Sequence, residues 1–110
     1  MRYRPITRNK EFSRAYSRGK SFVHPKLVLY VVKNRTGHTR VGLTATKKVG
    51  CAVKRNRARR VIRAALYEIL PYDVGGVDLV FVARGQTARC KSGEVRLAAE
   101  QLLKKAGILS

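Results

Sequence analysis

The stretch KRNRARRVIRAALYEIL, residues 54–70, predicts the longest element of the fold. Its apolar residues recur at the three- and four-residue spacing of one helix face, at Ala58, Val61, Ile62, Ala65, Leu66, Ile69 and Leu70. Pro71 follows directly, and proline cannot continue a helix. The pattern therefore predicts a helix over 54–70 that packs against the rest of the molecule by its apolar side.

The opposite side of this helix carries a stripe of positive charge. Arg55, Arg59 and Arg63 form one row on a helical wheel, with Asn56 and Arg60 beside it. Residues 47–63 contain eight Lys or Arg and no Asp or Glu, whereas a solvated helix face usually mixes the two signs. A guanidinium group binds two phosphate oxygens at once. The stripe therefore indicates an anionic partner.

The segments before this helix predict one helix and three strands. Phe12, Ala15 and Tyr16 have helical spacing, with Thr7 or Asn9 as the expected cap and Gly19 as a left-handed end. Residues 21–24, 27–33 and 40–46 are rich in strand-forming residues, and residues 34–38 are predicted to be the loop of a hairpin between the last two.

The segments after it predict one strand and one helix. Residues 77–83 form a nearly continuous apolar run, which is typical of a central buried strand. A last helix is expected to be capped by Ser92 and closed by Gly107. The order α-β-β-β-α-β-α predicts an α/β (α+β) two-layer sandwich with a mixed four-stranded sheet and a βαβ crossover, as a single domain over residues 1–110.

Length and charge narrow the class of protein. The chain has 110 residues, a formal net charge of +19 and 45% apolar residues, so it can bury one core and is expected to meet a polyanion. The longest apolar run, at 27–32, has six residues, far fewer than a membrane helix needs. No apolar stretch follows the basic N-terminus as in a secretory signal. We expect a cytoplasmic protein without a membrane partner.

Groups for catalysis or metal binding are sparse in the sequence. Cys51 and Cys90 lack the spacing of a zinc site and are predicted to be free thiols, one of them buried. The six acidic residues are scattered, whereas a metal-dependent nuclease needs several carboxylates to hold its ions. We therefore expect no cofactor bound by the protein and no cleavage of RNA by the protein alone.

The first predicted helix combines aromatic and basic residues. Phe12 and Tyr16 lie one turn apart, among Arg8, Lys10, Arg14 and Arg18. Aromatic side chains interleaved with cations suit single-stranded nucleic acid, because bases stack on the rings while cations follow the backbone. An aromatic pair can equally belong to the core, and the pattern leaves both interpretations open.

The stretch KKVGCAVKRNRARRVIRAAL, residues 47–66, resembles the signature of the bacterial ribonuclease P protein component. Its centre is Arg55-Asn56-Arg57, preceded by a Lys-Lys-x-Gly run and followed by a basic amphipathic helix. Residues 9–12, 27–30, 40–43 and 78–84 are also similar to the family's elements. Cys51 departs from the family, which usually has Asn there.

The resemblance implies a ribosomal protein S5 domain 2-like fold with a left-handed βαβ crossover. It also implies that the protein pairs with a catalytic RNA, without an obligate protein partner. The complex would remove the 5′ leader from precursor tRNA hydrolytically and leave the mature 5′ end. The chemistry would belong to the RNA and its Mg²⁺ ions, so the chain would be part of an endoribonuclease only within this ribonuclease P holoenzyme.

The resemblance further implies two groups of RNA-binding residues. The catalytic RNA would contact the basic helix at Arg57, Arg59, Arg60 and Arg63. The precursor tRNA leader would lie in a cleft formed by Phe12, Tyr16, Val28, Tyr30, Val32, Lys48, Arg55 and Asn56. Val28, Tyr30 and Val32 share one strand face by alternation, which agrees with such a wall.

Two other classes of protein remain as alternatives. A small ribosomal protein or another structural RNA-binding protein would share the length and the basicity, but needs no aromatic cleft beside its basic helix. A nuclease that acts alone is disfavoured by the scattered carboxylates.

Overall fold

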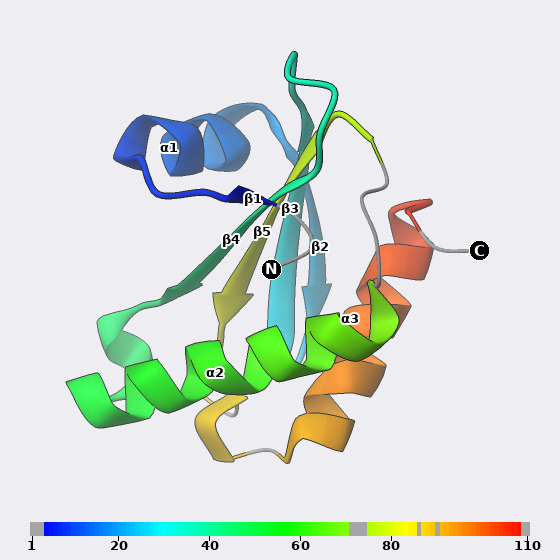
Figure 1. Cartoon of the computed structure of the whole chain (residues 1–110). Coiled ribbons are helices and arrows are strands. Elements are labelled where there is room, and N and C mark those ends of the chain that lie inside the picture. The colour runs from blue at the N-terminus through cyan, green and yellow to red at the C-terminus, as the bar shows by residue number, and fades with distance from the viewer. Residues whose placement is uncertain (1–3, 71–74, 86, 90, 109–110) are drawn as a thin grey trace.

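A computed structural model describes residues 4–70, 75–85, 87–89 and 91–108, and shows one twisted sheet with helices packed on it (Figure 1). The predicted α+β class and the predicted order of helices and strands are confirmed, with one strand added. The elements, in chain order, are β1 (Arg4–Pro5), α1 (Asn9–Arg18), β2 (Lys20–His24), β3 (Leu27–Lys33), β4 (Arg40–Ala45), the 3₁₀ turn η1 (Lys47–Val49), α2 (Ala52–Ile69), β5 (Val77–Ala83), the 3₁₀ turn η2 (Thr87–Arg89) and α3 (Ser92–Lys105).

Strand β5 forms the centre of the sheet, whose strand order is β1-β4-β5-β3-β2. It runs parallel to β4 and antiparallel to β3. Leu79, Val80 and Phe81 are fully buried, because helices cover both faces of the sheet at this point. The prediction of a central buried strand is confirmed, and its continuous apolar run follows from burial on both faces.

The predicted hairpin between the strands at 27–33 and 40–46 is wrong. These strands, β3 and β4, lie on either side of β5 and do not pair with each other. The hairpin of the fold instead joins β2 to β3, with His24 opposite Leu27. A strand that is apolar on both faces is buried most fully in the middle of a sheet, so β5 takes the place between β3 and β4.

The sheet has five strands, one more than predicted. β1 adds a parallel edge strand beside β4, where the Arg4 N–H donates to the Thr39 carbonyl and the Ile6 N–H donates to the Val41 carbonyl. The segment is two residues long and includes Pro5, so it has no alternation from which a strand could be predicted.

The two faces of the sheet are covered unequally. α2 and α3 pack on one face and build the larger core around Phe81, Leu29 and Leu79. α1 packs on the opposite face, where Ala15 and Val80 are buried with Ile6. α1 has only ten residues and forms a partial layer of its own, beyond the two layers predicted. Part of this face therefore remains open.

Helix α2 packs by the predicted face. Ala58, Ile62, Ala65 and Leu66 are buried, while Arg57, Arg60 and Arg63 are exposed. The helix begins at Ala52, two residues earlier than predicted, and ends at Ile69, before Pro71, which lies outside the described residues.

Three predicted helix ends differ from the structure. Gly19 is extended, with φ −79°, and is not left-handed. A Cβ atom at Gly19 would lie 2.5 Å from the Ala15 carbonyl oxygen, so close approach of the chain requires glycine here. Arg8 occupies the N-cap of α1 in place of Thr7 or Asn9, and Lys91 occupies that of α3 in place of Ser92. Gly107 closes α3 with φ +77°, as predicted.

The crossover from β4 to β5 through α2 has the left-handed geometry that the resemblance implied. In Figure 1 both strands run downwards, β5 lies to the right of β4, and α2 passes in front of the sheet. This geometry is left-handed, against the usual preference. It places the basic helix on the face opposite α1.

We predict that Ala65→Glu unfolds the protein. Ala65 is 1% exposed, and an unpaired carboxylate there costs several kcal/mol, a large share of the stability of a small domain. Ala64→Glu, at the exposed neighbouring position, is the matched control and should melt within a few degrees of wild type. The measurement is a thermal melt of both variants by circular dichroism. A wild-type melt of Ala65→Glu would mean that α2 packs by a different face.

Candidate nucleic-acid interface

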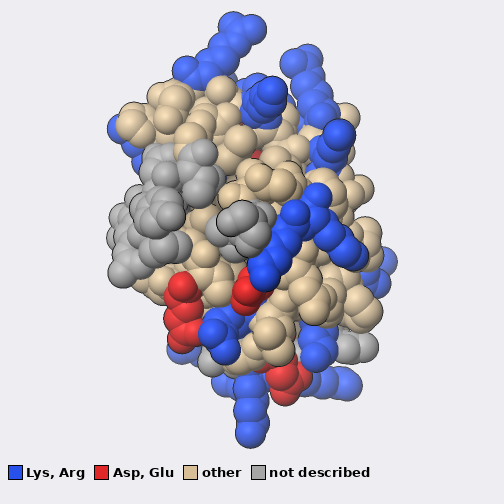
Figure 2. Space-filling model, turned by 90° about the vertical axis from the view of Figure 1, so that its right-hand side faces the viewer, with Lys and Arg blue, Asp and Glu red and all other residues tan. Residues whose placement is uncertain are grey.

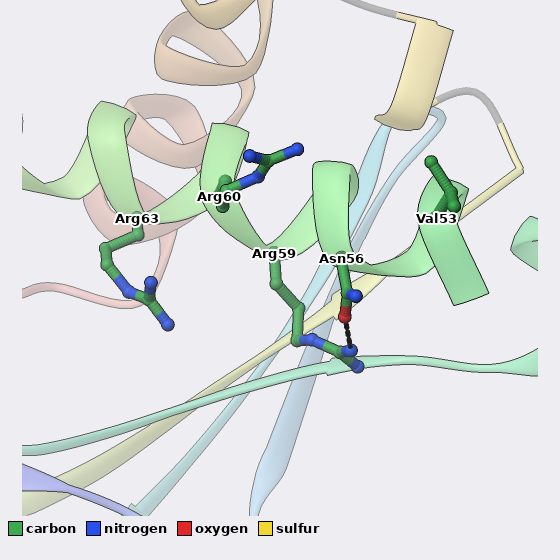
Figure 3. Close-up of a pocket in the computed structure, with 5 residues that line it drawn as sticks. All are labelled: Val53, Asn56, Arg59, Arg60 and Arg63. Carbon is green, nitrogen blue, oxygen red and sulfur yellow. Dashed lines mark hydrogen bonds between the residues drawn. The ribbon is translucent and has the colours of Figure 1, made fainter.

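A shallow hollow of about 390 Å³ lies along the basic side of helix α2 (Figure 3). We call its polar lining the α2 basic face, which consists of Asn56, Arg59, Arg60 and Arg63. The Arg59 guanidinium turns back along the helix and donates a hydrogen bond to the Asn56 side-chain oxygen, while the guanidinium groups of Arg60 and Arg63 point in different directions. Val53, 72% exposed, completes the lining at the start of the helix.

The α2 basic face holds its charge without an acidic residue in the same stretch. The only acidic residue of α2 is Glu68, near its end, where it pairs with Arg96 of α3 at 3.3 Å. Cations at i, i+4 repel one another by a few tenths of a kcal/mol per pair. Phosphate oxygens remove this repulsion, and the spread of guanidinium groups suits several phosphates along a backbone.

A second surface lies at the carboxyl end of β5, on the part of the sheet that α1 leaves open. Two adjoining hollows of about 310 and 380 Å³ share Lys48, Arg84 and Gly85, and we call them together the sheet hollow. Val28 and Val82 form an apolar floor in the first hollow. Arg89 of η2 extends the rim of the second. Cations around an apolar floor suit bases and phosphates together.

Tyr16 stands at the boundary between α1 and the sheet hollow. Its ring meets the ring of Tyr30 edge-on, with centroids 5.0 Å apart. Its hydroxyl is hydrogen-bonded to Thr44, which pairs in the sheet with Val82 of the floor. Partial burial raises the pKa of the Tyr16 hydroxyl above its ordinary value, more than the hydrogen bond with Thr44 lowers it. Tyr16 is still 43% exposed, so its ring can meet a ligand.

Phe12 and Val32, predicted in the same cleft, have different surroundings. Phe12 packs over Gly42, where an added Cβ atom would lie 2.7 Å from its ring. This packing favours the core interpretation of Phe12. Val28, Tyr30 and Val32 share a strand face as predicted, but Val32 packs in the core beneath α1 and lies away from the sheet hollow, four residues along β3 from Val28.

The three residues of the Arg-Asn-Arg motif separate in the structure. Asn56, predicted with the leader cleft, lies on the α2 basic face and accepts a hydrogen bond from Arg59. Arg57 is exposed on α2 but does not line the hollow of about 390 Å³. Arg55 is half-buried and lines neither this hollow nor the sheet hollow. Of the predicted leader residues, Val28 and Lys48 line the sheet hollow, and Tyr16 and Tyr30 lie beside it.

The structure adds two cations that the sequence analysis did not assign to a site, Arg84 and Arg89. Arg84 could have been found, since it directly follows the central strand and therefore lies at the same sheet edge as the residues after β4. Arg89 follows in η2, and no periodic pattern marks its direction.

Arg40 holds α1 against the sheet. Its guanidinium forms two hydrogen bonds of 2.7 Å with the Asp78 carboxylate, and a third with Glu11 of α1. Asp78 is fully buried and also accepts a hydrogen bond of 2.7 Å from Asn34. The hydrogen bond with Asp78, with a smaller contribution from Glu11, raises the pKa of the Arg40 guanidinium. Two of the acidic residues that seemed scattered in the sequence therefore meet at one cation.

Cys51 occupies the N-cap position of α2 as an exposed free thiol. Backbone N–H groups of Lys54 and Val53 and the charge of Lys54 lower the pKa of this thiol. Cys90 lies outside the described residues.

Two features that are typical of other protein classes are absent from the described ranges. No three His, Cys, Asp or Glu side chains there come together in a way that could hold a metal ion. No helix in the same part of the chain is long and apolar enough to cross a membrane.

Comparison with known proteins decides the family. The model of the Ribonuclease P family matches residues 1–107. The chain belongs to this family. A Ribonuclease P protein component from Clostridium botulinum (strain Loch Maree / Type A3) is 43% identical over 109 residues, which cover 98% of each chain. Another, from Oceanobacillus iheyensis, is 38% identical over 105 residues, or 94% of this chain and 87% of that one.

Solved structures of ribonuclease P proteins share the fold. The RNase P protein of Staphylococcus aureus superposes with a TM-score of 0.84 at 28% identity, covering 96% of this chain and 97% of that chain. The RNase P protein of Thermotoga maritima gives a TM-score of 0.78 at 25% identity, covering 92% and 96%. The fold class predicted from the sequence is confirmed by both likenesses.

We predict that Asp78→Asn lowers the free energy of unfolding by about 3 kcal/mol, because it leaves Arg40 without its buried counter-charge. Glu100→Gln removes the exposed ion pair with Lys104 and should cost less than about 0.5 kcal/mol. Urea unfolding of the two variants measures both values. Equal small losses would show that the buried pair does not hold α1 in place.

Proposed function

We propose that the chain is the protein subunit of ribonuclease P, which removes the 5′ leader of precursor tRNA by hydrolysis in the bacterial cytoplasm. Membership of the family and the bacterial relatives support this assignment. The observation that carries it is the presence of two distinct basic surfaces. The α2 basic face offers mainly guanidinium groups, whereas the sheet hollow joins cations to an apolar floor.

The α2 basic face binds the catalytic RNA in this proposal. Arg59, Arg60 and Arg63 contact phosphates, and Arg57 extends the contact along the exposed side of the helix. The hydrogen bond to Asn56 holds the Arg59 side chain in place before the RNA arrives, which reduces the entropy lost on binding.

The sheet hollow binds the single-stranded leader. A base can lie on Val28 and Val82 and meet the ring of Tyr16, while Lys48 and Arg84 neutralise the adjoining phosphates. These contacts are remote from the bond that is cut. They are made with precursor tRNA and not with the mature product, so they raise affinity for substrate over product.

Catalysis belongs to the RNA and its Mg²⁺ ions in this proposal, and the protein assists through charge. A net charge of +19 neutralises part of the repulsion between the catalytic RNA and the tRNA. The assembled complex therefore tightens at a lower Mg²⁺ concentration than the RNA alone requires.

Reconstitution tests the proposed function. Precursor tRNA is incubated at low Mg²⁺ with the protein, with a bacterial ribonuclease P RNA, or with both. Cleavage at the mature 5′ end only with both components is the expected result. Cleavage by the protein alone would identify a nuclease instead, and no effect of the protein on the RNA would favour a purely structural RNA-binding protein.

We predict that Arg60→Ala weakens binding to the catalytic RNA without unfolding the protein, because Arg60 is exposed on the α2 basic face. Loss of one phosphate contact should reduce the slope of log affinity against log salt by roughly 0.7 to 0.9. Filter binding over a range of salt concentrations measures the slope. The control is Lys104→Ala on α3, and a slope equal to that of the control would exclude Arg60 as a contact.

We predict that Tyr16→Ala weakens binding of precursor tRNA to the holoenzyme by about 1–3 kcal/mol, the contribution of one stacked base. Mature tRNA, which lacks the leader, should bind as before. Tyr67→Ala is the matched control, since Tyr67 is 42% exposed and Tyr16 is 43% exposed. An equal loss for both tRNAs, with a lowered melting temperature, would assign Tyr16 to the core alone.

A further inference from the structure

A groove of about 500 Å³ lies at the corner where the end of α1 meets the β2 edge of the sheet and the end of α3. Arg14 and Arg18 of α1, Lys20 of β2 and Lys33 of β3 stand around it. Phe22 and Val31 contribute an apolar floor, and none of the described residues that line it is acidic. We call it the corner groove. Its volume is in the range of nucleotide-sized ligands.

The corner groove is separate from the surfaces already described. Lys33 lies at the opposite end of β3 from Leu27, whose neighbour Val28 lines the sheet hollow. α1 crosses the sheet between the two, because Phe12 packs over β4 and Gly19 touches β3. α2 lies at the other end of the sheet in Figure 1, whereas β2 begins, and α3 ends, at its upper end. An RNA strand in the sheet hollow would have to cross α1 to reach this groove.

Arg14 is held in the groove before any ligand binds. Its Nη2 donates a hydrogen bond of 2.7 Å to the Lys33 carbonyl, which joins the end of α1 to the end of β3. Its Nε is buried and has no hydrogen-bond partner in the described structure. A ligand in the groove cannot reach this buried atom. Arg14 nevertheless lines the groove, and its positive charge, held there by the hydrogen bond to Lys33, attracts an anion.

The positive charge on the face around the corner groove favours a large polyanion as the ligand. Figure 2 shows the face with the β2 edge, where Lys and Arg side chains stand along the upper part and again at the lower end, and the clearly exposed acidic side chains lie in the lower part. The groove pairs these cations with an aromatic floor, the combination that suits a base and its phosphates. An acidic peptide would satisfy the charge, but it could stack on Phe22 only where it has an aromatic side chain, whereas every nucleotide of an RNA strand brings a base and a phosphate together.

We infer that the corner groove binds a single-stranded segment of the catalytic RNA, with a base on Phe22 and phosphates at Arg18 and Lys20. The inference rests on the proposed function. Precursor tRNA is the weaker candidate, because its single-stranded leader is assigned to the sheet hollow and α1 separates the two surfaces. The catalytic RNA thus contacts the protein at two places, the α2 basic face and the corner groove.

The test compares two double variants that lose the same charge. Arg18→Ala with Lys20→Ala removes two exposed cations of the groove. Lys91→Ala with Lys104→Ala removes two exposed cations at the two ends of α3, neither of which lines the groove. Binding to the ribonuclease P RNA alone is measured at several salt concentrations. The groove variant should lose about 1.4 from the log–log salt slope, the value for two phosphates of a single strand, and the control should lose much less.

A second variant probes the floor. Phe22→Leu keeps an apolar side chain but removes the flat ring, so it should weaken RNA binding at least about fivefold without changing the salt slope. A thermal melt of each variant verifies that it is folded. A Phe22→Leu protein that is folded and binds the RNA as wild type does would overturn the stacked base.

The outcomes separate this inference from the proposed function. If the wild-type protein does not bind the RNA at all, the proposed function fails. If the wild type binds and the groove and control variants lose equally, the groove is not an RNA site and the inference alone fails. If only precursor tRNA binding by the holoenzyme is weakened by the groove variant, the occupant is the tRNA, and the assignment to the catalytic RNA is overturned.

Discussion

The Arg40–Asp78 ion pair is the interaction on which the arrangement of the surfaces depends. Asp78 is fully buried in the central strand, and Arg40 on the neighbouring strand joins it to Glu11 of α1. The pair therefore fixes α1 over one end of the sheet. Because α1 is short and attached there, it leaves Val28 and Val82 at the other end to line the sheet hollow. The position of α1, which is fixed by the contact of Glu11 with Arg40, therefore leaves room for the sheet hollow.

Helix α2 combines a buried side that contributes to the core with an exposed side that carries much of the positive charge. Small side chains, Ala58 and Ala65, are fully buried on its inner side and allow close approach to the sheet, while its guanidinium groups stay at the surface. The acidic residues that the structure describes form ion pairs with cations of the protein itself, as in the pair between Glu68 and Arg96. Basic surface is thus left without local counter-charge, which suits an RNA partner.

The sequence patterns correctly predicted those features of the fold that depend on a single segment of the chain. The apolar face of α2 and the central place of β5 follow from periodicity within one segment, and the structure confirms both. The pairing of β3 and β4 with β5, the edge strand β1 and the contact of Glu11 with Arg40 join residues far apart in the chain. The spacing of residues within one segment does not indicate contacts of this kind, because they depend on how distant segments pack together. The same limit separates Tyr16 from Phe12, because their spacing is helical either way and only Gly42 shows which ring is covered.

The positions of the three surfaces also define what each can contribute to discrimination between tRNAs. Specificity is a difference of affinities, so a contact that is equal for precursor and product cancels. In the proposed function, contacts of the α2 basic face and the corner groove with the catalytic RNA are present in both complexes, and they stabilise the assembled holoenzyme. In the same proposal, the sheet hollow alone binds a group that only the precursor has, the 5′ leader. Since α1 keeps the hollow apart from the corner groove, the proposal implies that substitutions at Tyr16 or Lys48 change the affinity for the leader while the protein still assembles with the catalytic RNA.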